Sequence, residues 1–275
     1  MCSSDLTSKI TAAMKMVSAA KLKRAQDGHA RSKPYAEKLD EMLKRVLASV
    51  DAPDHPLLKT RDVGRIRYVI VSSDRGLAGG FNNNLFKAFL RRPADSVPVQ
   101  ALGIGRRARD MAARLKNVEA ISAGETNLPN YANASAIAEQ LVRDYLDGKC
   151  DKVVLVYNQF KNAAVQNVMV EQMLPIVPQA AAAGAKKTTN DYIFEPAKEE
   201  LVLELIPKSI KVQLYKALLD SNASEHGARM TAMNKATDNA GELLRDLRLS
   251  YNKARQAAIT GEILEIVAGA EALNG

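Results

Sequence analysis

Tryptophan is absent from this chain of 275 residues, and aromatic side chains make up only 5% of it. This scarcity disfavours the aromatic stacking surfaces on which single-stranded nucleic acids bind. The two cysteines, Cys2 and Cys150, form neither a disulfide framework nor a metal quartet, which favours a reducing compartment. No run approaches the ~20 apolar residues that a membrane span needs, and Met1–Leu6 is too short and polar for a signal peptide. The composition therefore predicts a soluble protein.

Proline is missing from residues 208–275, although the chain holds ten prolines. From Met233 to Ala268, apolar or small residues recur every three or four positions, which is the spacing of a supercoiled helix. A helix over most of this span would be roughly 90 Å long and could not bury itself in its own globule. The pattern therefore predicts a rod.

A second amphipathic helix is predicted at the other end of the chain. Its apolar stripe runs through Thr7–Gln26 and resumes at Tyr35–Val50, and Pro34 is expected to kink or interrupt it. Two prolines within Ala52–Pro56 are expected to end it. Because each rod has too narrow an apolar stripe to stand alone, we expect the two to pair as an antiparallel coiled coil.

Between the rods, short β-rich runs alternate with helix-like stretches, which is typical of a parallel α/β sheet. The expected strands are Ile66–Ser72, Val97–Leu102, Lys152–Tyr157 and one within Ala163–Leu174, and the expected helices are Asn83–Arg92, Arg106–Asn117 and Ser135–Leu146. Residues Gln179–Asp191 resemble an exposed loop, and Pro196 and Pro207 flank a short segment before the final helix. The predicted fold is α/β plus long helices, an antiparallel coiled coil with an inserted Rossmann-like domain, divided as residues 7–55, 65–206 and 207–275.

A glycine motif suggests one possible ligand site. The segment Gly103–Ala108 fits G-x-G-x-x-G/A, follows an expected strand and opens an expected helix, as in dinucleotide-binding folds. Two features speak against that reading: the motif follows the second strand, and the ribose-binding acid has only Glu119 and Glu125 as weak candidates. Tight strand-to-helix turns need glycine as well. A nucleotide-binding α/β enzyme is therefore one alternative function.

Other candidate sites carry little catalytic chemistry. The glycine-rich loop Ser72–Asn82 has no Lys after its glycines, as a phosphate loop would, and is interpreted as a structural or partner-facing loop. The three histidines, His29, His55 and His226, are far apart and lack metal-ligand spacing. No nucleophile motif accompanies them. The sequence therefore predicts no catalytic, cofactor-binding or metal-binding residues.

Charge and apolar surface instead point to partners. Basic residues dominate residues 1–50 and 61–116, and the first rod carries Lys15, Lys21, Lys23 and Arg24, which favours an acidic partner surface. A DNA-bridging coiled coil is the second alternative, although no helix-turn-helix, zinc-finger or basic-zipper organisation accompanies the basic rod. The segment Ala257–Leu273 is apolar on most of its faces, so we expect it to insert into another protein.

Three segments together resemble one family, the γ subunit of F-type ATP synthase. They are Lys9–Gln26, the loop Ser72–Asn82, and Ser224–Asn239 running on through Tyr251–Thr260, and the resemblance covers the chain from about Thr7 to Leu273. It implies a non-enzymatic rotor shaft that couples ion-driven rotation of a membrane ring to conformational change at the catalytic β subunits. The α and β subunits, the ε subunit and the c-ring would be its partners, on the cytoplasmic face of the bacterial plasma membrane. Nucleic acid and small-molecule substrates would not be.

The resemblance also implies which residues contact these partners. Contacts with the α/β ring are expected at Met14, Lys15, Arg255, Gln256, Thr260, Ile263, Leu264, Ile266 and Val267. Contacts with ε and the c-ring are expected at Tyr192, Glu195, Glu199 and Glu200. Two departures from the family pattern stand out. The family usually begins some twenty residues upstream, so a truncated start is suspected, and no cysteine pair offers the thiol switch of plastid relatives.

Overall fold

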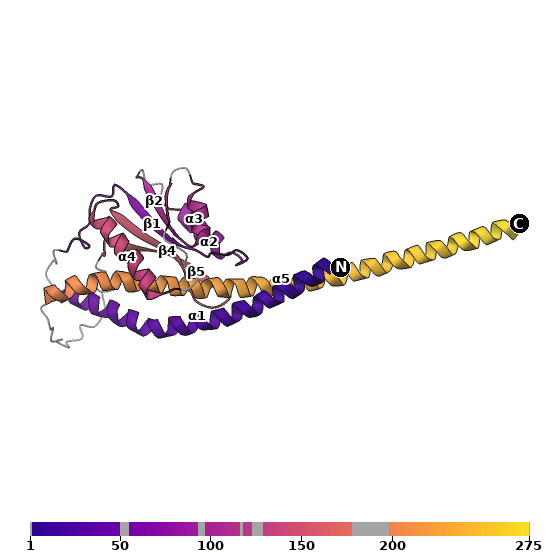
Figure 1. Cartoon of the computed structure of the whole chain (residues 1–275), viewed down its shortest axis with the longest axis horizontal. Helices are drawn as coiled ribbons and strands as arrows, with labels where there is room; N and C mark the ends of the chain where they lie inside the picture. Colours follow the sequence, from indigo (N-terminus) through magenta and orange to yellow (C-terminus); the bar gives the residue numbers. More distant parts are fainter. Residues whose placement is uncertain are drawn as a thin grey trace.

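The computed structural model describes residues 2–49, 55–92, 97–115, 118–122, 129–177 and 198–274. Two long helices dominate it: α1 (Cys2–Ser49) and α5 (Lys198–Asn274). They lie side by side and antiparallel, with an α/β domain on one flank, and α5 continues well past the start of α1 (Figure 1). The predicted fold class, an antiparallel coiled coil with an inserted α/β domain, is confirmed.

Small and apolar side chains join the two long helices. Leu22 and Ala25 of α1 pack with the fully buried Ala223 of α5. Polar pairs mark the same register on either side: His29 Nε2 lies 2.9 Å from Asp220 Oδ1, and Thr237 Oγ1 donates to Thr11 Oγ1 at 2.9 Å. Residue numbers on α1 rise as those on α5 fall, so the pairing is antiparallel over the length of α1.

The sheet has five strands in the order β3-β2-β1-β4-β5. The first four in that order run parallel, and β5 forms an antiparallel hairpin with β4. Their bounds are Ile66–Val71 for β1, Val99–Ile104 for β2, Val118–Ser122 for β3, Lys152–Phe160 for β4 and Gln166–Leu174 for β5. All six residues of β1 are buried, as expected for a central strand covered on both faces.

Helices cover both faces of the sheet. One face packs with α4 (Tyr131–Leu146) and both long helices in a core that includes Val69, Leu155 and Ile206. The other face packs with α2 (Phe81–Leu90) and α3 (Arg106–Ala112). The long helices therefore serve as one layer of the α/β domain as well as a rod (Figure 1).

Two expectations about proline were wrong in whole or in part. Pro207 does not precede the second rod, because it lies inside the continuous helix α5. Pro34 does not interrupt the first rod, because it lies inside the continuous helix α1, and a kink there stays a prediction. A proline inside a helix costs about 3 kcal/mol, whereas burying a Leu or Ile contributes about 1.5–3 kcal/mol. The residues Leu205, Ile206 and Ile210 around Pro207 are all buried in the main core, which outweighs the loss. The segment before Pro207 is helical for this reason.

The expected strands and helices of the domain are present with shifted bounds, and one strand was missed. That strand is β3, whose sequence Val118–Ser122 is short and contains Glu119. The segment Gln179–Asp191, expected as a loop, lies outside the described residues. The division of the chain at residues 55, 65 and 207 stays a prediction. Among the described helices, none combines the length and apolar character needed to cross a bilayer.

Candidate interaction site: the long helix in the crevice of the sheet

The strand order reverses at β1, and the carboxyl ends of β1 and β4 flank the point where α/β sheets commonly hold ligands. In this chain α5 crosses that point. Ser221 Oγ donates to Val71 O at 3.3 Å, and Ser224 Oγ donates to Asn158 O at 3.1 Å. Both serines are buried. The helix thus bonds to the ends of both strands and fills the crevice that a small ligand would otherwise enter.

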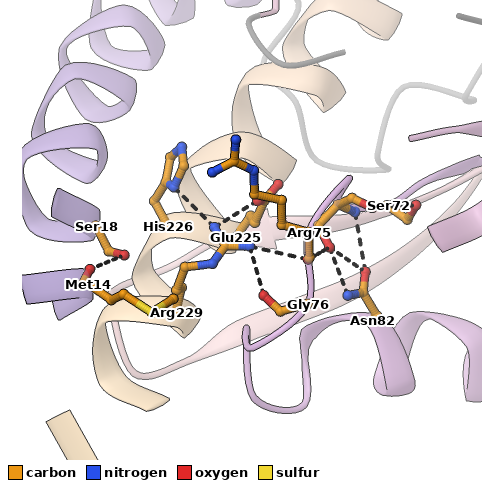
Figure 2. A network of polar contacts seen from close by, with 10 residues as sticks. Met14, Ser18, Ser72, Arg75, Gly76, Asn82, Glu225, His226 and Arg229 are labelled. Carbon is orange, nitrogen blue, oxygen red and sulfur yellow. Dashed lines mark hydrogen bonds and ion pairs between the residues drawn. The ribbon is translucent and has the colours of Figure 1, made fainter. Parts of the chain in front are cut away.

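A buried arginine extends this contact to the loop after β1. Arg229 Nη1 forms an ion pair with Glu225 Oε1 at 2.8 Å, and its Nη2 donates to the carbonyls of Arg75 and Gly76, each at 3.3 Å (Figure 2). We call these four residues the arginine clamp. The Arg229 guanidinium bonds both to its own helix and to the loop after β1. The clamp therefore holds the α/β domain at a fixed position along α5.

Burial favours the neutral form of both titratable groups beside the arginine clamp, so it shifts their pKa values in opposite directions. Burial raises the pKa of Glu225, and the Arg229 charge beside it only partly offsets that rise. Burial, followed by the charges of Arg229 and Lys21, lowers the pKa of His226 to about 4. The imidazole Nδ1 of His226 lies 3.5 Å from Arg229 Nη1. At neutral pH this site therefore holds a neutral histidine beside a fixed guanidinium.

This neutral histidine predicts acid sensitivity. Between pH 6.5 and about 4 the unfolded chain carries a proton on His226 that the folded chain does not, so stability falls as pH falls through this window. The expected loss is up to about 3 kcal/mol in total. Glu225 acts in the opposite direction, so the measurement compares the wild type with His226→Gln by urea unfolding at several pH values. Equal pH slopes for the two proteins would contradict the assignment.

The glycine motif Gly103–Ala108 has a structural task. Gly105 has φ 93° and ψ 149°, and a Cβ there would lie 2.4 Å from Ser72 O. The first backbone N–H groups of α3 are all bonded to the loop after β1: Arg106 N to Asp74 Oδ1 at 3.0 Å, Arg107 N to Ser73 O at 3.2 Å, and Ala108 N to Ser72 Oγ at 2.7 Å. A pyrophosphate would have to displace these bonds, so the geometry does not support the nucleotide reading.

The remaining candidates of that reading lie elsewhere. Glu119, the possible ribose ligand, pairs across strands with Gln100 and accepts from its Nε2 at 2.7 Å near the amino ends of β2 and β3. Glu125 lies outside the described residues. The three histidines are dispersed, and His55 Nδ1 accepts from Leu57 N at 3.1 Å. Among the described residues, no three side chains of metal-ligand type gather.

The expected partner-contact residues fall in separate places. Met14 is half-buried and Lys15 is exposed on α1. The others lie on the part of α5 beyond the start of α1, where every described residue from 251 to 271 except Gly261 is exposed: Arg255, Gln256, Thr260, Ile263, Leu264, Ile266 and Val267. Tyr192 and Glu195 lie outside the described residues, and Glu199 and Glu200 fall in the first turn of α5 with no side-chain description. Their contact roles stay predictions.

Sequence reasoning missed the clamp itself. Arg229, Glu225 and Ser224 lie within the segment Ser224–Asn239 that carries the family resemblance, and Ser221 lies three residues before it, yet their spacing matches no ligand motif. The available signal was a set of polar residues, Ser221, Ser224 and Arg229, on a helix face that also carries Leu218 and Ala228. Such residues need partners when buried, which indicates that this face of the helix packs against another part of the chain.

Comparisons with known proteins agree with this arrangement. A profile of the family described as ATP synthase matches residues 1–273. The ATP synthase gamma chain of Flavobacterium johnsoniae is 50% identical over 272 residues, which is 98% of this chain and 94% of the relative. The gamma chain of Geotalea daltonii is 46% identical with the same coverage. The central stalk of the mitochondrial ATP synthase of Tetrahymena thermophila has the same fold, with a TM-score of 0.60 at 24% identity over 83% of this chain and 99% of that one.

Two long antiparallel helices, one of them packed into the crevice of a lateral sheet, define a class of protein in which a two-helix rod carries an α/β domain on one flank, with a shared core. The chain belongs to the γ-chain family of ATP synthases. It is therefore a non-catalytic subunit of the central stalk, and catalysis takes place in the β subunits of the complex.

Proposed function

We propose that the chain is the rotor shaft that links a rotating membrane ring to the catalytic α/β ring of an F-type ATP synthase. The observation that carries this proposal is the free stretch of α5 (residues 251–271), where Ile263, Leu264 and Ile266 are exposed by 54%, 63% and 71%. With 3.6 residues per helical turn, these three side chains do not share one narrow face. Apolar side chains exposed on several sides of a helix need a surrounding partner. A ring of subunits with an apolar inner wall would supply it, and the α and β subunits are such partners.

The shaft acts mechanically. The shaft is not symmetric about its long axis, because α1 lies along one side of α5 and the α/β domain packs against one flank of the pair (Figure 1). An asymmetric rod that turns inside a ring presents a different surface to each surrounding subunit in succession. Differential contact free energy of this kind shifts the conformational equilibrium, and hence the nucleotide affinity, of each subunit in turn. The exposed Lys15 on α1 would add attraction to acidic loops of the ring.

The opposite end of the shaft would face the membrane. There the α/β domain and the first turns of α5 would contact ε and the c-ring, through a region that includes Tyr192, Glu195, Glu199 and Glu200. The relatives of this chain include bacterial gamma chains, which supports a peripheral place on the cytoplasmic face of a bacterial plasma membrane. Proton or sodium flow through the membrane ring would then drive rotation.

Reconstitution tests the shaft role. The chain is mixed with α and β subunits of a bacterial relative, any complex is isolated by size exclusion, and its ATPase activity is measured. We expect one copy of the chain per three αβ pairs and ATPase well above that of the separate subunits. A chain that stays monomeric and leaves the αβ subunits inactive would contradict the proposal.

Within that complex, the double variant Arg255→Ala/Gln256→Ala is expected to lower ATP turnover about tenfold. Two hydrogen bonds to the ring, each contributing about 0.5–1.5 kcal/mol, would be lost when the rotor passes its binding positions. Both residues are exposed, so the melting temperature of the isolated chain should not change. Arg245→Ala, an exposed arginine alongside the start of α1, is the matched control. Full turnover in an intact complex of the double variant would remove these two residues from the contact set.

A further inference from the structure

Leu77 combines an unfavourable backbone conformation with an apolar side chain that is exposed to water. It is the sole non-glycine residue with positive φ among the described parts of the chain, at 61°. Its side chain is also 65% exposed. A leucine in the left-handed region is strained, because its Cβ crowds the following carbonyl. Folding alone would favour Gly or Asn at this position, so a leucine here calls for a function.

The loop that carries Leu77 is held firmly from several sides. Ser73 Oγ donates to Arg75 O at 2.7 Å, and Asn82 Nδ2 donates to Ser73 Oγ at 2.8 Å. The arginine clamp fixes the carbonyls of Arg75 and Gly76 directly before Leu77. The residue after it, Ala78, is 3% exposed and packs with Phe81 and Ala228. The surroundings therefore impose the conformation of Leu77 while leaving its side chain in water.

Cationic side chains flank this exposed leucine. Arg75 is exposed two residues earlier, and the Arg107 guanidinium lies over Gly76, within 2.8 Å of where a Cβ would stand. The nearby carboxylate, Asp74, is engaged with the backbone N–H of Arg106. An apolar tip with two arginines beside it matches a protein surface that offers an apolar depression rimmed by carboxylates.

The position of the loop along the shaft selects the partner. The neighbouring Gly79 lies against Ala232 of α5, where a Cβ would be 3.6 Å from the alanine Cβ, and α5 then continues toward the free stretch. The loop is thus at the end of the domain that faces the protruding rod (Figure 1). Ala232 lies 19 residues before residue 251, which is about 28 Å of helix. A ring that surrounds the free stretch of α5 and also the adjoining part of the two-helix rod would meet this loop at its rim.

We propose that Leu77 is a docking knob, held in a strained backbone conformation so that it inserts into an acidic, partly apolar surface at the rim of the ring around α5. This inference rests on the proposed shaft function. The strain would be offset by burial of the leucine in the complex, which alone could strengthen association about tenfold or more. Because the arginines contribute through long-range attraction, the association rate would fall as salt rises.

The test uses Leu77→Gly and Leu77→Asn, which both suit a positive φ and both remove the apolar tip. Melting temperatures are measured on the full chain, and affinity and ATPase are measured with α and β subunits of a bacterial relative. We expect unchanged or raised melting temperatures, by up to about 2–4 °C, together with affinity lowered about tenfold. Leu77→Met should retain wild-type affinity, and Leu90→Asn, at an exposed leucine that ends α2, is the control.

Each outcome separates the knob from the shaft. Wild-type affinity and turnover in both Leu77 variants would overturn the knob and leave the shaft function intact. Lower melting temperatures in both variants would also overturn it, since Leu77 would then serve the fold. Failure of the wild-type chain itself to bind the ring would remove the shaft function, and the knob with it.

Discussion

Replacing Arg229 with alanine is expected to lower the free energy of unfolding by about 3–5 kcal/mol, the usual cost of removing one partner of a buried ion pair. Arg229 and Glu225 keep only 9% and 17% of their side-chain surface exposed. Without the guanidinium, the buried carboxylate loses its counter-charge, and the carbonyls of Arg75 and Gly76 lose their donors. The pKa of Glu225, already raised by burial, should rise further.

The measurement is urea unfolding of the wild type, Arg229→Ala and the double variant Arg229→Met/Glu225→Gln. The double variant removes both charges while it keeps most of the buried volume, so it should recover a large part of the loss. Limited proteolysis adds a local readout, because the loop after β1 should be cut faster in Arg229→Ala when the clamp is gone. Stability within 1 kcal/mol of the wild type in Arg229→Ala would show that the clamp contributes little.

The rods were predictable because a long helix repeats one simple pattern. The heptad spacing from Met233 to Ala268 and the stripe of α1 depend only on local periodicity. Pro34 and Pro207 misled the prediction for the opposite reason. Their cost is local and visible in the sequence, whereas the packing that outweighs it comes from residues far along the chain, such as Val46 and Val153 in the main core.

The interaction site could be predicted only in part. The free apolar stretch of α5 was visible in the sequence, because its side chains change from one-sided to all-round apolar character. The arginine clamp was not visible in the sequence, because Arg229 donates to backbone carbonyls that lie 153 and 154 positions away along the chain. Long-range hydrogen bonds to backbone atoms leave no side-chain pair to find. The same holds for Ser221, whose partner is the carbonyl of Val71.

The glycine motif shows how one pattern can arise from two causes. In a dinucleotide site the glycines let the backbone approach a pyrophosphate. Here Gly105 lets β2 turn into α3 beside Ser72. Ser72 Oγ accepts the hydrogen bond from a backbone N–H of α3 that would otherwise be donated to a phosphate. Both cases require a glycine before a helix N-terminus, so the letters alone do not distinguish them. The neighbouring loop does, because it already supplies the acceptors.

Gly105→Ala is accordingly expected to destabilise the chain by about 2–5 kcal/mol. The φ and ψ of 93° and 149° lie in a region that is essentially restricted to glycine, and the added Cβ would stand 2.4 Å from the backbone oxygen of Ser72. Neither β1 nor β2 can move away, since both are paired on each side. The strain and the overpacking therefore add.

Gly148→Ala is the matched control for this prediction. Gly148 also has a positive φ, 74°, but a Cβ there would meet no atom within 4 Å. It should lose only the backbone contribution, about 1–2 kcal/mol. The difference between the two variants in urea unfolding then isolates the steric contact with Ser72. Equal losses in both would mean that β2 can shift relative to β1, and that the turn at Gly105 is not fixed by the loop that carries the arginine clamp.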